Sequence, residues 1–239
     1  MKIGNGLRSI SKEAFEYCSN LSEITIPAGI ESIGIKAFEA AGLRKLTFEN
    51  NSRLTVISYA AFYGCWLTSV DFPDSLMYIG GGAFSKCSLS SISFGEGSSL
   101  QSIGDAAFRY APLATVAFPA NIRTIGDYAF ADTAIAGSVT IPASLESLGG
   151  GAFGACHALT EIKVESGNKI YADIDGVVYT KDGKTAVAYP AGNPAENYTV
   201  LDGTQKIGVA AFYGSFPNVG KIVMPTVTLN KEHIVKLHG

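Results

Sequence analysis

Residues 121–142 read NIRTIGDYAFADTAIAGSVTIP, and close variants of this string recur along the chain. Each variant carries an Ala-Phe pair, and an aliphatic residue, usually followed by Gly, stands five positions before the Phe. The first seven of these phenylalanines are separated by 23, 24, 22, 24, 22 and 23 residues. Self-similarity with a period of about 20 to 50 residues is typical of stacked repeat proteins. The eight markers are Phe15, Phe38, Phe62, Phe84, Phe108, Phe130, Phe153 and Phe212.

A short alternating stretch follows each Phe by about eight to twelve positions, as in ITI at residues 24–26. Alternation turns the apolar pair inward and the middle residue outward, so each stretch is predicted to be a strand. Where the stretch ends in Pro, the next Phe lies 12 residues after the last strand residue, and after Phe48 and Phe94, where Pro is absent, it lies 14 residues away. The additional pair falls in the polar stretches 49–52 and 95–99, so length varies only in a surface turn. Pro brings no N–H to a ladder and therefore fits a place where a strand stops pairing.

A coil of some two dozen residues cannot bury its apolar side chains alone, so the coils are expected to stack around one continuous core. The predicted fold is a right-handed, strand-rich solenoid of 22–24-residue coils, with one parallel sheet, tight turns opposite it and little helix. The period breaks between Val164 and Phe212, and Asp182-Gly183 between two alternating stretches predicts an inserted β-hairpin element at 170–200.

A single domain is expected over residues 1–239. Within it, the repeats are expected at about 7–169 and 201–225, and a C-terminal closing segment is expected at 226–239.

The repeat resembles that of the BspA-like leucine-rich-repeat family, whose unit reads approximately Leu-Thr-x-Ile-x-Ile-Pro followed by Ile-Gly-x-x-Ala-Phe-x-x-Cys. The match runs from about Leu7 to Pro225 and includes Asp-Gly-Val-Val-Tyr at 175–179 and Tyr-Pro-Ala-Gly at 189–192. The resemblance implies a leucine-rich-repeat solenoid from a bacterial cell-surface protein. Some family members are adhesins for extracellular-matrix or plasma glycoproteins, so it also implies export, with the signal segment absent from this chain.

Charge and hydropathy argue against two classes of partner. The net charge is −3 with 16% charged residues, so the basic stripe that grips a phosphate backbone is not expected, and neither is nucleic acid binding. No apolar run approaches the roughly 20 residues that a bilayer span needs. No membrane span is therefore expected in this chain.

The residues that could carry chemistry are better explained by packing. Cys18, Cys65, Cys87 and Cys156 each stand three residues after a repeat Phe, where other coils have Ala, Thr or Ser, so small buried side chains are expected there. A disulfide between Cys65 and Cys87, on neighbouring coils, is the less favoured alternative. The motifs of zinc sites and phosphate loops are absent, and the glycine triplets at 80–82 and 149–151 precede Ala-Phe as turns. No cofactor, metal or enzyme activity is expected.

Function is therefore expected on the outward side of the sheet, where solenoids bind partners along a concave surface. The chain is predicted to be a non-catalytic binding module for a protein or glycoprotein ligand, such as one of the host extracellular matrix; the alternative is a spacer or self-assembling repeat protein. Trp66 is expected to wedge against the adjacent turn, and an exposed anchor is the less favoured alternative. The candidate ligand face is Glu23, Thr25, Lys45, Thr47, Ser69, Asp71, Ser91, Ser93, Thr115, Thr140, Glu161, Lys163 and Lys221, and the candidate aromatic contacts in the insertion are Tyr171, Tyr179, Tyr189 and Tyr198.

Overall fold

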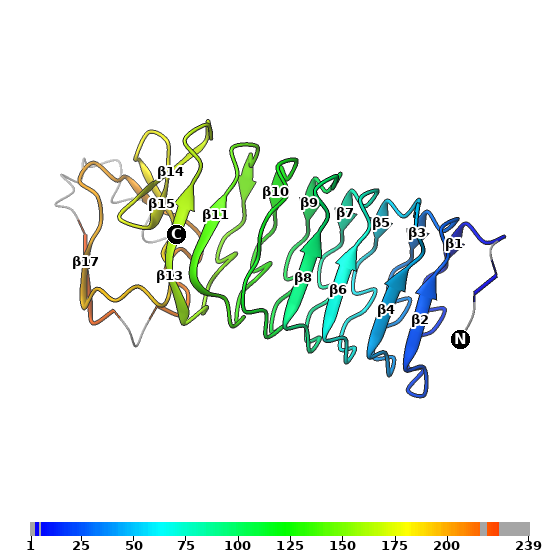
Figure 1. Ribbon diagram of the computed structural model, residues 1–239. Coiled ribbons are helices and arrows are strands. Elements are labelled where there is room, and N and C mark those ends of the chain that lie inside the picture. Colours follow the sequence, from blue (N-terminus) through cyan, green and yellow to red (C-terminus); the bar gives the residue numbers. More distant parts are fainter. Residues whose placement is uncertain (1–2, 5, 216–218, 225–239) are drawn as a thin grey trace, which may run out of the picture.

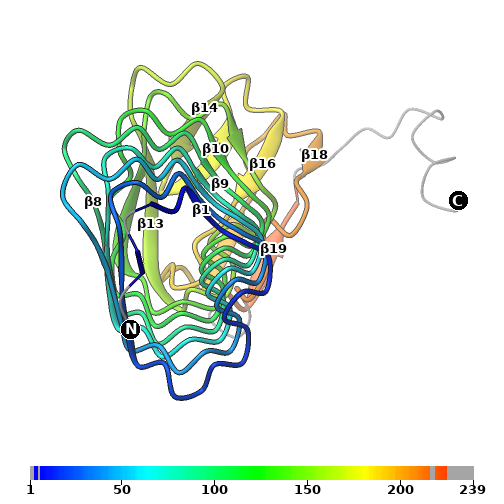
Figure 2. The same cartoon turned by 90° about the vertical axis from the view of Figure 1, so that its right-hand side faces the viewer.

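The computed structural model describes residues 3–4, 6–215 and 219–224. The coils stack into an elongated column, and each coil has three sides: a long strand, a short strand and a turn segment built around the repeat Phe (Figures 1 and 2). No helix occurs in the described residues. The prediction of a strand-rich repeat solenoid is therefore confirmed. The closing segment predicted at 226–239 lies outside the described residues.

The short strands form one uninterrupted parallel sheet of seven strands. Each contains the aliphatic residue that stands five positions before a repeat Phe, and it pairs with the equivalent residue of the next coil, as Ile10 does with Ile33. This second line of strands was missing from the prediction of one sheet, because two residues are too few to show an alternating pattern. The strands are β1 (Ser9–Ile10), β3 (Ser32–Ile33), β5 (Val56–Ile57), β7 (Tyr78–Ile79), β9 (Ser102–Ile103), β10 (Thr124–Ile125) and β12 (Ser147–Leu148).

The long strands lie side by side toward the viewer in Figure 1, but their hydrogen-bonded ladder is interrupted. β2 pairs with β4, β6 with β8 and β11 with β13, whereas residues 115–118 form no strand. Each interruption precedes a stretch that ends in Pro73, Pro119 or Pro142, and Pro has no N–H to donate to the preceding coil. The long strands are β2 (Glu23–Ile26), β4 (Lys45–Phe48), β6 (Ser69–Phe72), β8 (Ser91–Phe94), β11 (Ala136–Ile141) and β13 (Ala158–Val164).

The turn segment around each repeat Phe satisfies its backbone without a helix. The residues two before and two after the Phe have positive φ in all eight coils, including non-glycine residues such as Lys36 (φ 55°) and Ala40 (φ 51°). Around Phe38, the N–H groups of residues 36, 38 and 40 donate to the carbonyls of 59, 61 and 63 on the next coil, at 2.7 to 2.9 Å. The N–H groups of 37, 39 and 41 instead close turns within their own coil. Alternate residues thus bond between coils and within a coil.

The repeat phenylalanines form a column of stacked rings through the core. Adjacent rings from Phe15 to Phe153 have centroids 5.0 to 5.7 Å apart and interplanar angles of 3° to 13°. Phe38 to Phe153 are at most 2% exposed. Phe72 and Phe118, from the long-strand side, meet the column edge-on. Offset stacking at such distances adds to the hydrophobic stabilisation of each coil contact.

Replacing one ring of the column should lower the stability of the stack. We expect Phe108→Ala to lower the free energy of unfolding by about 3–5 kcal/mol, because the cavity would interrupt the stack between Phe84 and Phe130. Tyr17→Ala, at a ring that is 66% exposed, is the control and should cost less than about 1 kcal/mol. Urea unfolding of the two variants measures the difference, and equal losses would refute the column as a source of stability.

The inserted element forms an internal wall rather than a projecting hairpin. β14 (Tyr171–Ile174), β15 (Val177–Thr180) and β16 (Thr185–Ala188) are antiparallel, as predicted around Asp182-Gly183, and β16 pairs in parallel with β18 (Lys206–Ile207). Val178 and Ala188 pack into the main core, whereas Val177, Tyr179 and Ala186 pack into a second, smaller core. The sheet is buried on both faces and separates the two cores. β17 (Asn197–Thr199) and β19 (Lys221–Val223) pair in parallel beyond it.

Asn168 fixes the junction between the last regular coil and this wall. Its side chain is buried and makes four hydrogen bonds. Nδ2 donates to the carbonyls of Pro142 and Leu145, and Oδ1 accepts from the N–H groups of Ile170 and Tyr171. All the bonding capacity of one amide is therefore used to turn the chain out of the repeat.

Asn168→Ala should cost at least about 2 kcal/mol of unfolding free energy, because it leaves two N–H groups, that of Tyr171 buried, and two carbonyls without this partner. Asn121→Ala, which removes one bond from an exposed side chain to the carbonyl of Ser98, is the matched control and should cost under about 1 kcal/mol. Chemical denaturation followed by circular dichroism compares them, and equal small losses would mean that the junction does not depend on Asn168.

Candidate ligand-binding face

The candidate ligand residues lie mainly along one side of the column. We call the outward side of β2, β4, β6, β8, β11 and β13 the long-strand face (Figure 1). Of the thirteen candidates, Thr47 and Glu161 are half-buried and the other eleven are exposed. Thr115 lies on this side of its coil but in no strand, and Lys221 lies apart on β19. The structure therefore keeps these side chains accessible along several successive coils.

Polar side chains on the long-strand face bond from coil to coil. The hydroxyls of Thr25 and Thr47 are 2.8 Å apart, and the hydroxyl of Ser93 donates to the carboxylate of Asp71. On β13, the ammonium of Lys163 lies 3.1 Å from the carboxylate of Glu161. These contacts order short polar rows across neighbouring strands.

The N-terminal half of the long-strand face is hollowed over β2, β4 and β6. A hollow of about 120 Å³ lies between Glu23, Thr25 and Lys45. A hollow of about 440 Å³ follows between β4 and β6, and one of about 530 Å³ extends it toward the turns after these strands. The candidates that line these hollows are Glu23, Thr25, Lys45, Thr47, Ser69 and Asp71.

The prediction of aromatic ligand contacts in the insertion is wrong for three of its four tyrosines. Tyr171, Tyr179 and Tyr189 are 7%, 0% and 3% exposed. Tyr198 is half-buried, and its hydroxyl lies 2.7 Å from that of Tyr179. Burial raises the pKa of Tyr189 and Tyr198. The physical reason is that the inserted strands lie between two cores, so their aromatic side chains pack inward.

Exposed aromatic side chains lie elsewhere and were missed as a set. Tyr17 and Tyr110 occupy the position two after the repeat Phe, and Tyr59 stands three before it; all three are exposed. Trp66 is 57% exposed, and the Arg44 guanidinium lies 5.9 Å from its ring centroid. The structure thus favours the exposed-anchor interpretation of Trp66. Aligning the residues around each Phe could have found Tyr17 and Tyr110, because other coils place Lys, Asp or small residues there.

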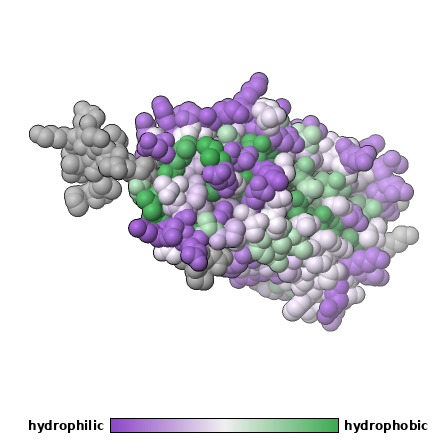
Figure 3. All heavy atoms as spheres, turned by 60° about the vertical axis from the view of Figure 1, so that its left-hand side comes forward, coloured by the Kyte–Doolittle hydropathy of each residue, from purple (hydrophilic) through white to green (hydrophobic). Residues whose placement is uncertain are grey.

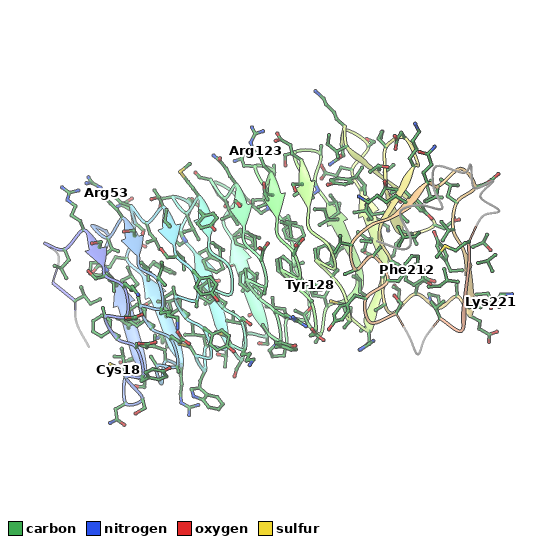
Figure 4. All side chains as sticks on the ribbon, turned by 180° about the vertical axis from the view of Figure 1, so that it is seen from behind. Cys18, Arg53, Arg123, Tyr128, Phe212 and Lys221 are labelled. Atoms are coloured by element: carbon green, nitrogen blue, oxygen red, sulfur yellow. The ribbon has the colours of Figure 1, made fainter. Side chains whose placement is uncertain are left out.

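A cluster of tyrosines around Arg109 links distant coils on the turn side. The guanidinium lies 4.7, 5.2 and 5.9 Å from the ring centroids of Tyr110, Tyr128 and Tyr213, and it bonds Asp132 at 3.0 Å. A side chain at Gly154 would collide with the Tyr213 ring, and one at Gly151 with the Tyr128 ring. Gly151 of the second glycine triplet and Gly154 therefore make room for these rings. Figure 4 places Tyr128, like Cys18, on the lower half of the column as seen from behind, away from Arg53 and Arg123 on the upper edge.

Three further features bear on what the described residues could bind. Hydrophobic and hydrophilic residues are interspersed over the face in Figure 3, so no broad apolar patch marks a partner there. Within the described ranges, no three His, Cys, Asp or Glu residues are grouped so that they could hold a metal ion. The same part of the chain contains no helix of sufficient length and apolar character to cross a membrane.

Three of the four cysteines serve as small core residues, as predicted, but Cys18 is exposed. The thiols of Cys65, Cys87 and Cys156 donate to the carbonyls of the Phe residues on the preceding coils, at 3.1, 3.1 and 3.2 Å. Cys18 belongs to the first coil and has no such neighbour among the described residues. All four thiols are free. Burial raises the pKa of Cys65 to about 12 and also raises those of Cys87 and Cys156.

Thiol labelling checks this arrangement. Because the thiolate is the reactive form and burial suppresses it, we expect Ellman's reagent at mildly alkaline pH to label Cys18 alone in the folded protein. All four should react after denaturation, when the pKa values return to their ordinary range. Cys18→Ser should abolish the fast phase, and rapid native labelling of a second thiol would contradict the buried positions.

Comparison with known proteins agrees with the geometry of the coils. Residues 1–96 and 55–174 match the family model described as the BspA type leucine rich repeat region, in six copies. The chain belongs to this family. No curated protein matches it. Proteins of such repeat families act as interaction scaffolds, so the chain is a leucine-rich-repeat interaction module.

Solved structures of bacterial leucine-rich-repeat proteins share the fold. The pneumococcal vaccine antigen PcpA matches with a TM-score of 0.66 and 26% identity, over 94% of this chain and 54% of that one. A leucine-rich repeat protein from Eubacterium ventriosum matches with a TM-score of 0.68 and 25% identity, over 85% of this chain and 48% of that one. A leucine rich cell surface protein from Faecalibacterium prausnitzii, at 19% identity, has a TM-score of 0.62 over 94% of this chain and 69% of that one. This chain spans about half the length of the first two.

Proposed function

We propose that this chain is a non-catalytic module of an exported cell-surface protein, and that it binds a protein or glycoprotein through the long-strand face. The observation that carries the proposal is the set of exposed polar side chains, ordered from coil to coil and hollowed over β2, β4 and β6. A rigid stack holds these groups in place without a ligand, which lowers the ordering cost of binding.

Two further observations support this proposal. One related structure, the pneumococcal antigen at 26% identity, is described as a vaccine antigen, which is in keeping with a surface location. The titratable groups of the long-strand face form separate pairs on distant coils: Lys45 and Asp71 line the hollow between β4 and β6, and Glu161 and Lys163 pair with each other on β13. General acid–base catalysis needs such groups within hydrogen-bond reach of one reacting atom. Adhesion to a host or neighbouring cell is the role that fits this surface best.

The test is binding of the purified chain to a panel of matrix glycoproteins, mucins and polysaccharides by biolayer interferometry. A variant with Thr47→Arg, Asp71→Arg and Ser93→Arg places three long side chains on the long-strand face and should abolish saturable binding. The control, with Tyr78→Arg, Gln101→Arg and Ser147→Arg, changes exposed residues on the short-strand side and should keep it. Equal binding by both variants would move the site off the long-strand face, and no binding by the unmodified chain would favour a spacer role.

A further inference from the structure

A polar slot runs between β4 and β6, where the long-strand ladder is interrupted. The two strands are neighbours in the stack, yet no backbone hydrogen bond joins them among the described residues. Glu49 directly follows β4 and Glu165 directly follows β13, and the N–H group of each donates to the preceding coil. Pro73 occupies the equivalent position after β6 and has no N–H to donate. Without that donor the two edges separate, and the hollows of about 440 and 530 Å³ meet at Phe48 and Asp71. We call this continuous space the slot.

The walls of the slot offer donors and acceptors of both charge signs. Arg44 and Lys45 line one end and form no ion pair within the described residues. Thr47 and Ser69 contribute hydroxyls at the middle, and Asp71 faces both hollows with one carboxylate oxygen bonded to Ser93. Unpaired main-chain edges add further N–H and carbonyl groups. A bound molecule must therefore satisfy donors and acceptors together.

An exposed indole lies next to Arg44, which lines one end of the slot, although the indole itself is not among the lining residues. Arg44 both lines the slot and lies over the Trp66 ring, which ties the indole to the slot entrance. Trp66 remains 57% exposed, although burying an aromatic ring is ordinarily favourable. It gives the entrance an apolar surface next to a strongly polar wall.

We propose that the slot binds a neutral oligosaccharide, with a pyranose ring stacked on Trp66 and sugar hydroxyls bonded to Lys45, Thr47 and Asp71. This inference rests on the proposed binding function and names the chemistry that one part of the face recognises. Sugars have C–H faces that pack on aromatic rings and hydroxyls that donate and accept hydrogen bonds. These two properties match the Trp66 indole and the polar wall of the slot.

Other classes of ligand fit the slot less well. An anion would meet Asp71, Asp74 and Glu49, and a cation would meet Arg44 and Lys45, so either would have like charges close by. An apolar ligand would leave the edges and side chains of the slot desolvated without partners, which costs about 1–3 kcal/mol per group. A hydroxyl-rich, uncharged molecule avoids both penalties.

Trp66 also provides the measurement, because it is the only tryptophan in the chain. The full chain is titrated with cellotetraose, chitotetraose, maltotetraose and mannotetraose, with excitation at the red edge where tyrosine does not absorb. We expect at least one of these to shift the Trp66 emission to the blue and to protect it from acrylamide quenching, with saturation in the micromolar to millimolar range. No saturable response to any of the four would overturn the proposal.

Calorimetric titration of variants with the responding sugar locates the site. Trp66→Ala and Asp71→Ala should each weaken binding by roughly tenfold or more, and Trp66→Phe should retain part of the affinity. Tyr17→Ala and Ser147→Ala are matched controls, an exposed ring and an exposed hydroxyl on the short-strand side away from the slot, and should leave the affinity unchanged. Equal affinity across all five variants would place the sugar elsewhere and refute the slot.

The outcome is separable from that of the proposed function. Gelatin peptides, which carry no tryptophan, are titrated in parallel; a saturable Trp66 response to them alone would assign the slot to polypeptide and overturn the saccharide. Glycoprotein binding lost in the Thr47, Asp71 and Ser93 variant but unchanged in Trp66→Ala would keep the long-strand face as the binding surface while rejecting the slot as a sugar site.

Discussion

Around every repeat Phe, the residues two positions before and two positions after it have positive φ, and the rest of the molecule depends on this backbone conformation. A left-handed conformation costs a residue other than Gly roughly 1–2 kcal/mol. The chain keeps this many left-handed residues only because the stack compensates the cost of each one. The compensation is a row of short hydrogen bonds to the next coil together with a ring stacked on its neighbour. Neither contribution exists in an isolated coil, which is why the fold is a property of the stack.

With the turn side held in this way, the opposite side is free to vary. The long strands pair only where the residue after the following strand has an N–H, so Pro73, Pro119 and Pro142 divide that side into separate two-stranded units. The division leaves unpaired strand edges, and between β4 and β6 it opens a polar slot beside Trp66. The Pro residues after the long strands therefore determine where the candidate binding face is interrupted.

The inserted element forms the same backbone hydrogen bonds to the next coil as a regular repeat does. Its strands take the place of a coil, because β16 pairs with β18 and the N–H of Tyr189 donates to the carbonyl of Ala211, as the repeat Phe N–H groups do elsewhere. The Tyr189 ring stacks on Phe212 at 5.1 Å and carries the aromatic packing into the second core. The insertion therefore continues the solenoid, and its tyrosines stabilise it instead of facing a ligand.

The sequence by itself determined the repeat, the inward Phe and Ile positions, the hairpin at Asp182-Gly183 and the outward side of the long strands, since each follows from spacing and alternation within one coil. It could not determine the second line of strands, the positive φ around each Phe, the exposure of Cys18 or the burial of Tyr179 and Tyr189. Those features depend on which coil lies next to which, and the contacts join residues 20 or more positions apart in sequence. Predicting the slot would have required both sequence and structure. Pro73 is visible in the sequence, but only the stacked structure shows that Pro73, without an N–H, lies opposite β4 and that Trp66 and Arg44 lie together near the entrance.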